Sequence, residues 1–246
     1  MFITKGKDNV RKVLTLSKWI KESDNTIVFT GAGMSTESGI PDFRSKDGLW
    51  RGIDPMKVAC IDAIRKNYDL FHQLYKERVE NLEKCKPHIG YDILAKWEGQ
   101  GLINRIITQN VDGFHERAGN TNVYCLHGSI NSFRCSQCDQ PASKEDFINK
   151  EPCSKCGGLL RPGVVLFGEA LDQDILNKAI NEIKKADLVI VIGTSLMVYP
   201  VNMLPSMSKG RKVYINKEIS HEEFDLDIPA MAGQILLELE QIINSN

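Results

Sequence analysis

The sequence predicts an α/β protein with a Rossmann-like, doubly wound parallel sheet and a smaller second domain formed by insertions. Short runs of β-branched and apolar residues recur along the chain, and stretches with helical spacing of apolar residues lie between them. Buried strands that alternate with helices are typical of a parallel sheet that is covered on both faces. Two stretches that lack this alternation are the candidates for the insertions.

The order of the elements follows from the same patterns. The first apolar-periodic segment, 10–20, predicts an amphipathic helix, and the continuous apolar run at 26–30 predicts a buried strand that leads straight into Gly31. Ligands on such sheets bind at the carboxyl ends of the strands, so the polar residues that follow them are candidate site residues. The other predicted strands are 103–108, 123–126, 164–167, 188–192 and 213–215, and the other predicted helices are 89–97, 114–118 and 175–185.

The two irregular stretches differ in composition. Residues 45–85 are charged and mostly helical in pattern, whereas residues 129–163 are rich in cysteine and polar residues. We expect both to join in a smaller domain beside the sheet. The main domain is then discontinuous and consists of residues 1–44, 86–128 and 164–246.

Bulk properties exclude several classes of protein. The 246 residues suffice for one large domain with an insertion or for two small domains, and a formal net charge of -1 gives no global attraction to nucleic acid or anionic membranes. The longest apolar run, 188–192, is too short to span a bilayer. Seven cysteines without a secretion signal favour a metal site plus free thiols over a disulfide framework. We expect a cytoplasmic monomer with no membrane or nucleic-acid partner.

A glycine-rich loop follows the first predicted strand. Gly31 and Gly33 allow the backbone to approach a pyrophosphate, and free amides there can point at it. Thr36 occupies the place of the third glycine of the usual dinucleotide fingerprint. Taken alone, the pattern is also compatible with a simple tight turn between strand and loop.

A second polar strand end begins at Gln109. Asn110 and Asp112 place an amide and a carboxylate where they could hold a carboxamide or the hydroxyls of a sugar. The alternative is that Asp112 only caps the predicted helix at 114–118.

A histidine, His127, stands between the predicted strand 123–126 and Gly128. An imidazole with a pKa of about 6.5 can accept a proton at neutral pH without a large shift. A lone histidine is more often structural than catalytic, and His115 is expected to be structural.

Four cysteines form two Cys-x-x-Cys pairs with fourteen residues between them. This spacing predicts a zinc ion bound by four thiolates, and such an ion is structural because no coordination position stays open. Free thiols or a redox pair are the alternatives. A nucleic-acid-binding ribbon is disfavoured because acidic residues outnumber lysines between the pairs. The predicted ligands are Cys135, Cys138, Cys153 and Cys156.

From about residue 26 to residue 217, the order and the residues of these motifs resemble those of the sirtuin family, the NAD-dependent protein-lysine deacylases. The string Gly-Ala-Gly-x-Ser-x-x-Ser-Gly-Ile-Pro-Asp-Phe-Arg is unbroken from Gly31 to Arg44, and Gln-Asn-Val-Asp and Leu-His-Gly follow at 109–112 and 126–128. The resemblance implies that NAD is consumed as a co-substrate and that zinc is structural.

The activity implied by the resemblance is transfer of an acyl group from lysine to ADP-ribose. Nicotinamide leaves, His127 acts as general base on a ribose hydroxyl with Asn110 beside it, and the products are free lysine and O-acyl-ADP-ribose. Protein mono-ADP-ribosylation is the alternative reaction, and a non-enzymatic module that binds zinc or NAD is a third possibility.

The resemblance also implies a set of NAD contacts from four segments. Phe43 would lie over the nicotinamide ribose, where an aromatic side chain can keep water from a cationic sugar. The implied contacts are Gly31, Ala32, Gly33, Thr36, Asp42, Phe43 and Arg44, then Gln109, Asn110, Val111, Asp112 and His127, and finally Gly193, Thr194, Ser195 and Asn216.

The implied substrate site takes an extended acyl-lysine peptide between two backbone segments, by addition of a strand. One segment is Gly168-Glu169 and the other runs from Leu196 to Val198. Val165 and Phe167 would line the acyl-lysine tunnel, with ordinary core packing as the alternative for both.

The acyl preference depends on two further residues. Tyr75 and Arg78 are three residues apart, which places them on one helix face. The resemblance suggests that such a pair holds a succinyl or malonyl carboxylate, since arginine can bind a carboxylate through two hydrogen bonds. The alternative is that the two residues lie on a solvated helix face. A preference for acetyl-lysine remains the leading expectation.

Overall fold

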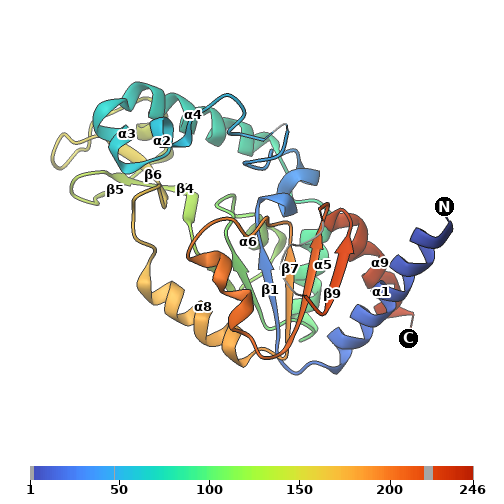
Figure 1. The fold of residues 1–246 in the computed structure, drawn as a ribbon. Helices are drawn as coiled ribbons and strands as arrows, with labels where there is room; N and C mark the ends of the chain where they lie inside the picture. Colours follow the sequence, from blue (N-terminus) through green and yellow to red (C-terminus); the bar gives the residue numbers. More distant parts are fainter. Residues whose placement is uncertain (1–2, 47, 219–223, 246) are drawn as a thin grey trace.

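The computed structural model describes residues 3–46, 48–218 and 224–245 (Figure 1). Its larger part is a six-stranded sheet in the order β3-β2-β1-β7-β8-β9, and every pair of neighbouring strands is parallel. The order reverses between β1 and β7, which makes their carboxyl ends the topological switch point. The strands are β1 Thr26–Thr30, β2 Arg105–Thr108, β3 Val123–Cys125, β7 Leu188–Ile192, β8 Arg211–Asn216 and β9 Leu226–Pro229.

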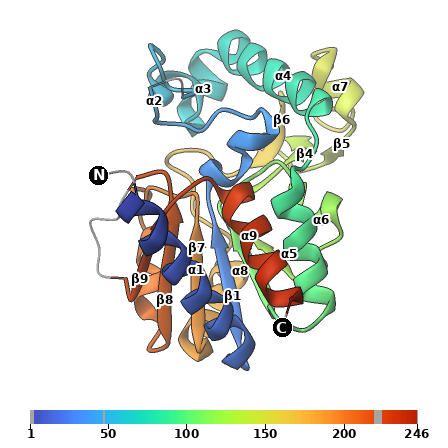
Figure 2. The same ribbon diagram turned by 90° about the vertical axis from the view of Figure 1, so that its right-hand side faces the viewer.

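Helices cover both faces of this sheet (Figures 1 and 2). Alternate strand residues point to opposite faces: Val28 and Ile190 belong to one apolar cluster, whereas Phe29 and Val191 belong to the other. The first cluster includes residues of α1 Ile3–Glu22, α5 Ile89–Gly99 and α9 Ala232–Asn244, and the second includes residues of α8 Gln173–Lys185. The predicted fold class of the main domain is thereby confirmed.

A smaller unit lies across the carboxyl ends of the large sheet (Figure 2). It contains an antiparallel three-stranded sheet in the order β5-β4-β6 and a group of helices. Its strands are β4 Gly128–Cys135, β5 Pro141–Ala142 and β6 Leu160–Val164, and its helices are α2 Pro55–Val58, α3 Ile61–Lys66, α4 Tyr68–Lys84 and α7 Lys144–Ile148. The remaining elements are α6 Phe114–Ala118 and the 3-10 turns η1 Ala32–Ser38, η2 Val201–Met203 and η3 Pro205–Met207.

Contacts between α4 and the small sheet hold the smaller unit together. The Tyr68 hydroxyl donates to the carbonyl of Leu160 at 2.7 Å, and His72 Nε2 lies 2.6 Å from the carbonyl oxygen of Phe147. The strands β4 and β6 extend one residue beyond the predicted insertion at each end, to Gly128 and Val164. The division of the chain into domains stays a prediction.

One predicted strand is wrong, and the strands of the small sheet and β9 were missed. The segment 164–167 does not join the parallel sheet, because β6 ends at Val164 and pairs antiparallel with β4. Its amides instead bridge two other segments: Val165 donates to the carbonyl of His127 at 2.8 Å, and Phe167 donates to that of Ala59 at 3.0 Å. In the large sheet the missed strand is β9, which lies at the sheet edge and contains only a short apolar pattern.

The described residues include no helix with the length and apolar character that a membrane span requires.

The four predicted zinc ligands come together at one end of the small sheet. Their sulfur atoms all lie within 4.8 Å of one another, with 3.5 Å between Cys135 and Cys156 and 3.7 Å between Cys138 and Cys153. A tetrahedral zinc ion with Zn–S bonds of about 2.3 Å spaces its sulfur ligands about 3.8 Å apart. The cluster therefore fits a structural zinc ion.

Removal of the metal should unfold the small sheet, since four thiolates without zinc no longer cross-link β4 to the loop before β6. We expect Cys153→Ser to lose the zinc, about one ion per chain, and to melt at a clearly lower temperature. Elemental analysis and thermal unfolding measure both effects. Cys125→Ser is the matched control, because Cys125 lies in β3 outside the cluster. Full zinc content in Cys153→Ser would contradict the assignment.

Candidate active site

A cavity of about 530 Å³ opens at the carboxyl ends of the central strands, between the large sheet and the smaller unit. Residues that follow β1, β2, β7 and β8 line one side of it, and residues of α4 and the 164–169 segment line the other. Clefts at the switch point of a doubly wound sheet are where such folds bind their ligands. The polar strand ends predicted from the sequence therefore meet in one place.

Backbone contact between two strand ends forms the floor of the cavity. The Gly31 amide donates to the carbonyl of Ile192 at 3.0 Å, and the Gly33 amide donates to that of Gly193 at 2.7 Å. Gly193 has a φ of +63°, and a Cβ there would lie 2.2 Å from the amide nitrogen of Met34. Only glycine allows this approach. Ala32 and Thr36 consequently line the cavity directly above the β1–β7 junction.

The amide of Asn110 is fixed by its hydrogen bonds. Its Nδ2 donates to the Gly31 carbonyl and to Ser35 Oγ, both at 3.0 Å, and its backbone amide donates to Thr108 Oγ1. The Gly31 carbonyl can only accept, so the nitrogen must face it. Oδ1 is then the polar atom of this side chain that is left for a ligand in the cavity.

His127 has a defined tautomer. Its Nδ1 lies 3.0 Å from the carbonyl oxygen of Gln109, and because a carbonyl only accepts, Nδ1 carries the proton. Nε2 therefore has a free lone pair and is the basic atom. Burial lowers the pKa of His127, and the hydrogen bond to Gln109 opposes this only in part. The imidazole is thus neutral at physiological pH and ready to accept a proton.

Asp112 lies beneath the cavity and does not line it. One carboxylate oxygen accepts from Ser35 Oγ at 2.7 Å, and the other accepts from the amide of Phe114 at 3.0 Å. Burial raises the pKa of Asp112, and the hydrogen bonds from Ser35 and Phe114 oppose the rise. The predicted direct contact between Asp112 and the cofactor stays a prediction, as does a contact from Val111, which does line the cavity.

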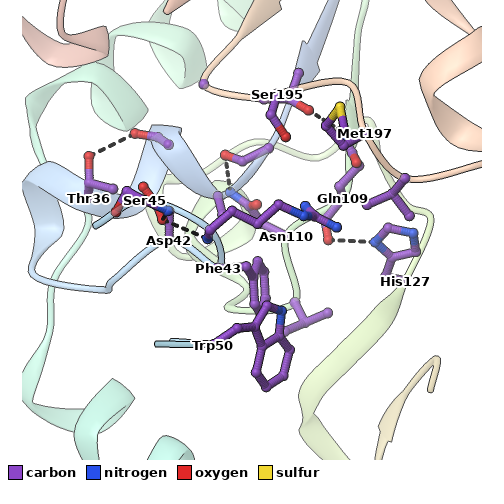
Figure 3. Close-up of a pocket in the computed structure, with 18 of the residues that line it drawn as sticks. Thr36, Asp42, Phe43, Ser45, Trp50, Gln109, Asn110, His127, Ser195 and Met197 are labelled. Atoms are coloured by element: carbon purple, nitrogen blue, oxygen red, sulfur yellow. Dashed lines mark hydrogen bonds between the residues drawn. The ribbon is translucent and has the colours of Figure 1, made fainter. Parts of the chain in front are cut away.

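Two stacked aromatic rings stand on one side of the cavity. The ring centroids of Phe43 and Trp50 are 5.4 Å apart, and Asp42 Oδ1 holds the turn between them by accepting from the amides of Arg44 and Ser45. Figure 3 shows Thr36 and Asp42 toward one end of the cavity, His127 toward the other, and Phe43, Trp50 and Asn110 between them.

A hydrogen-bond network joins the carboxyl ends of β2, β7 and β8 at the cavity. Gln109 Nε2 donates to Thr194 Oγ1 at 3.0 Å, the Tyr214 hydroxyl donates to the Thr194 carbonyl, and Asn216 Nδ2 donates to the Tyr214 hydroxyl. Thr194, Ser195 and Asn216 all line the cavity, and their predicted contacts with a cofactor stay a prediction.

The segment on the opposite side is braced by a buried ion pair. Arg161 Nη1 and Nη2 donate to the two carboxylate oxygens of Glu169 at 2.5 and 2.9 Å, and Nη2 also donates to the Val164 carbonyl at 2.6 Å. Burial favours the neutral form of Glu169, but these bonds hold its pKa below the usual value. The carboxylate of Glu169 is therefore committed to Arg161.

The other predicted substrate residues are placed as follows. Gly168 and Val198 line the cavity together with Val165 and Phe167, whereas Leu196 is buried and does not. Tyr75 and Arg78 both lie on α4 and line the cavity. The Arg78 guanidinium carbon lies 5.1 Å from the Tyr75 ring centroid and 5.7 Å from that of Phe43.

Sequence reasoning missed several lining residues. Ser45 directly follows the glycine-loop string and Trp50 comes shortly after it, so their proximity could have been inferred. Ala59 and the 230–232 segment belong to no motif and reach the cavity only through tertiary packing. The missed residues are Ser45, Trp50, Ala59, Val164, Leu166, Leu171, Tyr199, Pro200, Ile215, Lys217, Glu218, Ala230, Met231 and Ala232.

Comparisons with known proteins agree with this geometry. Residues 31–200 match the family model described as Sir2 family. The NAD-dependent protein deacetylase of Oceanobacillus iheyensis is 46% identical, over 81% of this chain and 86% of that protein. NAD-dependent protein deacylase 1 of Archaeoglobus fulgidus is 41% identical, over 91% and 95%. A solved Sir2 variant with deacetylated p53 peptide and 3′-O-acetyl ADP-ribose has a TM-score of 0.88 at 34% identity, covering 93% of this chain and 97% of that chain.

The close backbone contact at the cavity floor should not tolerate a side chain at Gly193. In Gly193→Ala, the added Cβ meets the Met34 amide at a positive φ, so we expect the free energy of unfolding to fall by about 2 to 4 kcal/mol in urea denaturation. Gly99→Ala is the control, because a Cβ at Gly99 meets nothing within 4 Å. Equal stability of the two variants would show that the floor is not tightly packed.

Proposed function

The chain belongs to the Sir2 family, and we propose that its cavity carries out NAD-dependent deacylation of protein lysines. The acyl group passes from lysine to ADP-ribose, so that NAD, acyl-lysine and one water give nicotinamide, free lysine and O-acyl-ADP-ribose. The observation that carries this function is the juxtaposition of His127 Nε2 with the cavity face of Asn110 above the β1–β7 switch point. The resemblance to sirtuins seen in the motifs is confirmed.

The residues fit NAD along the length of the cavity. NAD is consumed as a co-substrate, and its nicotinamide–ribose bond supplies the reactive sugar carbon. The glycine floor leaves room for a pyrophosphate next to Ala32 and Thr36, while Thr194, Ser195 and Asn216 face the adenosine end. Asn110 Oδ1 and the Gln109 side chain are the polar groups available to the ribose near His127.

His127 supplies the base. Because the Gln109 carbonyl holds the proton on Nδ1, Nε2 can take a proton from a ribose hydroxyl, and the same carbonyl stabilises the imidazolium that results. Phe43 and Trp50 form an apolar wall that keeps water from the reacting sugar.

The lysine enters from the opposite side. The segment from Val165 to Glu169 is held by hydrogen bonds to His127, Ala59 and Arg161, so its backbone presents a rigid edge to a peptide. Val165 and Phe167 line the path toward His127. Main-chain pairing with a peptide at such an edge gives affinity with loose sequence requirements.

Product analysis tests this function. We expect the wild-type protein, given NAD and an acetyl-lysine peptide, to yield O-acetyl-ADP-ribose by mass spectrometry. His127→Ala should lose on the order of 10² to 10⁴ in turnover, because it removes the general base. Zinc content and melting temperature serve as controls for the fold. ADP-ribose attached to protein, without O-acetyl-ADP-ribose, would replace deacylation by the mono-ADP-ribosyltransferase alternative.

The acyl preference follows from the surroundings of Arg78. Its guanidinium lies between the rings of Tyr75 and Phe43, and within the described ranges no carboxylate comes within ion-pair distance of it. Burial lowers the pKa of Arg78, yet arginine stays charged at neutral pH. Asp112 stabilises the charge of Arg78 only from beyond ion-pair distance, and a half-buried cation that no carboxylate contacts favours an anionic ligand. We therefore propose that succinyl- and malonyl-lysine are substrates in addition to acetyl-lysine.

Removing the charge of Arg78 tests whether it selects acidic acyl groups over acetyl. In Arg78→Met, we expect the ratio of succinyl to acetyl kcat/KM to fall by about 10- to 100-fold, the value of a hydrogen-bonded charge. Arg65→Met, on the exposed part of α3, should leave the ratio unchanged. An unaltered ratio in Arg78→Met would assign Arg78 to packing against Phe43 alone.

We also propose that the protein acts in the cytoplasm as a monomer without nucleic-acid partners. The net charge of -1 and the reduced thiols required by a four-cysteine zinc site support this. The two insertions, 45–85 and 129–163, are proposed to form a separate small domain.

A further inference from the structure

Tyr91 belongs to no motif, yet it lies at the centre of the polar cluster beneath the cavity. Its side chain is fully buried in α5, and its ring packs against His88, Phe114 and His115 with centroid distances of 5.1, 5.6 and 4.7 Å. Its hydroxyl lies 2.7 Å from Ser35 Oγ. A buried tyrosine hydroxyl needs a hydrogen-bond partner, and the partner here is Ser35, which also contacts Asn110 and Asp112.

The number of hydrogens around Ser35 fixes the direction of each bond. Ser35 Oγ has three polar neighbours: Asn110 Nδ2 at 3.0 Å, Asp112 Oδ2 at 2.7 Å and the Tyr91 hydroxyl at 2.7 Å. Asn110 donates, because its amide nitrogen carries two hydrogens and has no lone pair available to accept. The Asp112 carboxylate can only accept, so it takes the single hydrogen of Ser35. The remaining lone pair of Ser35 must accept from Tyr91.

We propose that Tyr91 is a positioning residue for the deacylation, acting through Ser35 on both Asn110 and Asp112. By filling the last acceptor site of Ser35, the Tyr91 hydroxyl orients the Ser35 hydrogen toward Asp112. The same arrangement leaves Ser35 able to hold the Asn110 amide with Oδ1 toward the cavity. The proposal rests on the proposed function, because Asn110 is the member of the cluster that meets the ribose.

The charges around the cluster agree with a donating Tyr91. Burial, and then the nearby charge of Asp112, raise the pKa of Tyr91 well above its usual value, so the hydroxyl keeps its proton. Asp112 also faces Glu116 of α6, which raises its pKa, and Arg78 of α4, which lowers it. A chain of donors that ends on a carboxylate strengthens each bond in it. Loss of the Tyr91 hydroxyl therefore raises the pKa of Asp112 further.

Tyr91→Phe tests the hydroxyl and keeps the ring. We expect kcat for an acetyl-lysine peptide to fall about three- to tenfold, the value of one net hydrogen bond, with the peptide KM within about twofold of wild type. At acid pH, kcat of Tyr91→Phe should fall further below the wild-type value than it does at neutral pH, because Asp112 then takes up a proton more readily.

Tyr68→Phe is the matched control. Its hydroxyl makes an equally short bond, to the Leu160 carbonyl at 2.7 Å, but lies in the smaller unit away from Ser35. It should lose similar thermal stability and keep the wild-type kcat and pH profile. Tyr91→Phe with a wild-type kcat and pH profile, or with the same changes as Tyr68→Phe, would overturn the positioning role.

Failure of the proposed function gives a different result. If the wild-type protein forms no O-acyl-ADP-ribose, deacylation itself is wrong, whatever Tyr91 does. Calorimetric titration of NAD, from neutral pH down to the lowest pH at which the protein stays folded, then decides the matter for Tyr91 alone, because burial raises the pKa of Asp112. Weaker NAD binding at the acid end in Tyr91→Phe, and not in Tyr68→Phe, supports its role, whereas identical curves refute it.

Discussion

The architecture of the site depends on the contact between two backbones at the switch point of the sheet. Gly33 reaches the Gly193 carbonyl directly, so no side chain stands between the ends of β1 and β7. The same contact leaves the Gly31 carbonyl facing Asn110, and it sets Thr194 against Gln109. One close approach thus creates the space that we propose for a pyrophosphate and positions polar groups at both of its ends.

Carbonyl oxygens of the main chain determine the chemistry of the two central side chains. The Gly31 carbonyl turns the amide of Asn110, and the Gln109 carbonyl selects the tautomer of His127. Because carbonyls cannot donate, neither side chain has a second arrangement of equal energy. The sheet therefore prepares a neutral base and a fixed acceptor before any ligand arrives, which lowers the cost of reorganisation in the reaction.

How much of this could be read from the sequence depends on the range of the interactions. The strands 26–30 and 188–192 were predicted at their observed bounds, because continuous apolar runs indicate burial on both faces. The zinc ligands were found because their spacing is local. The strands of the small sheet were missed, because buried and exposed residues do not alternate regularly along β4, and β6 is buried at almost every position. Tyr91 and Ala59 reach the site from distant segments, and only the fold brings them there.

The segment 164–167, wrongly predicted as a strand, connects the cysteine cluster to the candidate active site. His127 immediately precedes β4, and Val165 immediately follows β6. These two strands pair with each other, and their far ends carry or approach the cysteine cluster. The hydrogen bond from Val165 to the His127 carbonyl closes the ladder at the cavity. Cross-linking at the distant end would therefore fix the separation between His127, the proposed base, and Val165, in the proposed wall of the acyl-lysine path, without direct contact from a zinc ligand.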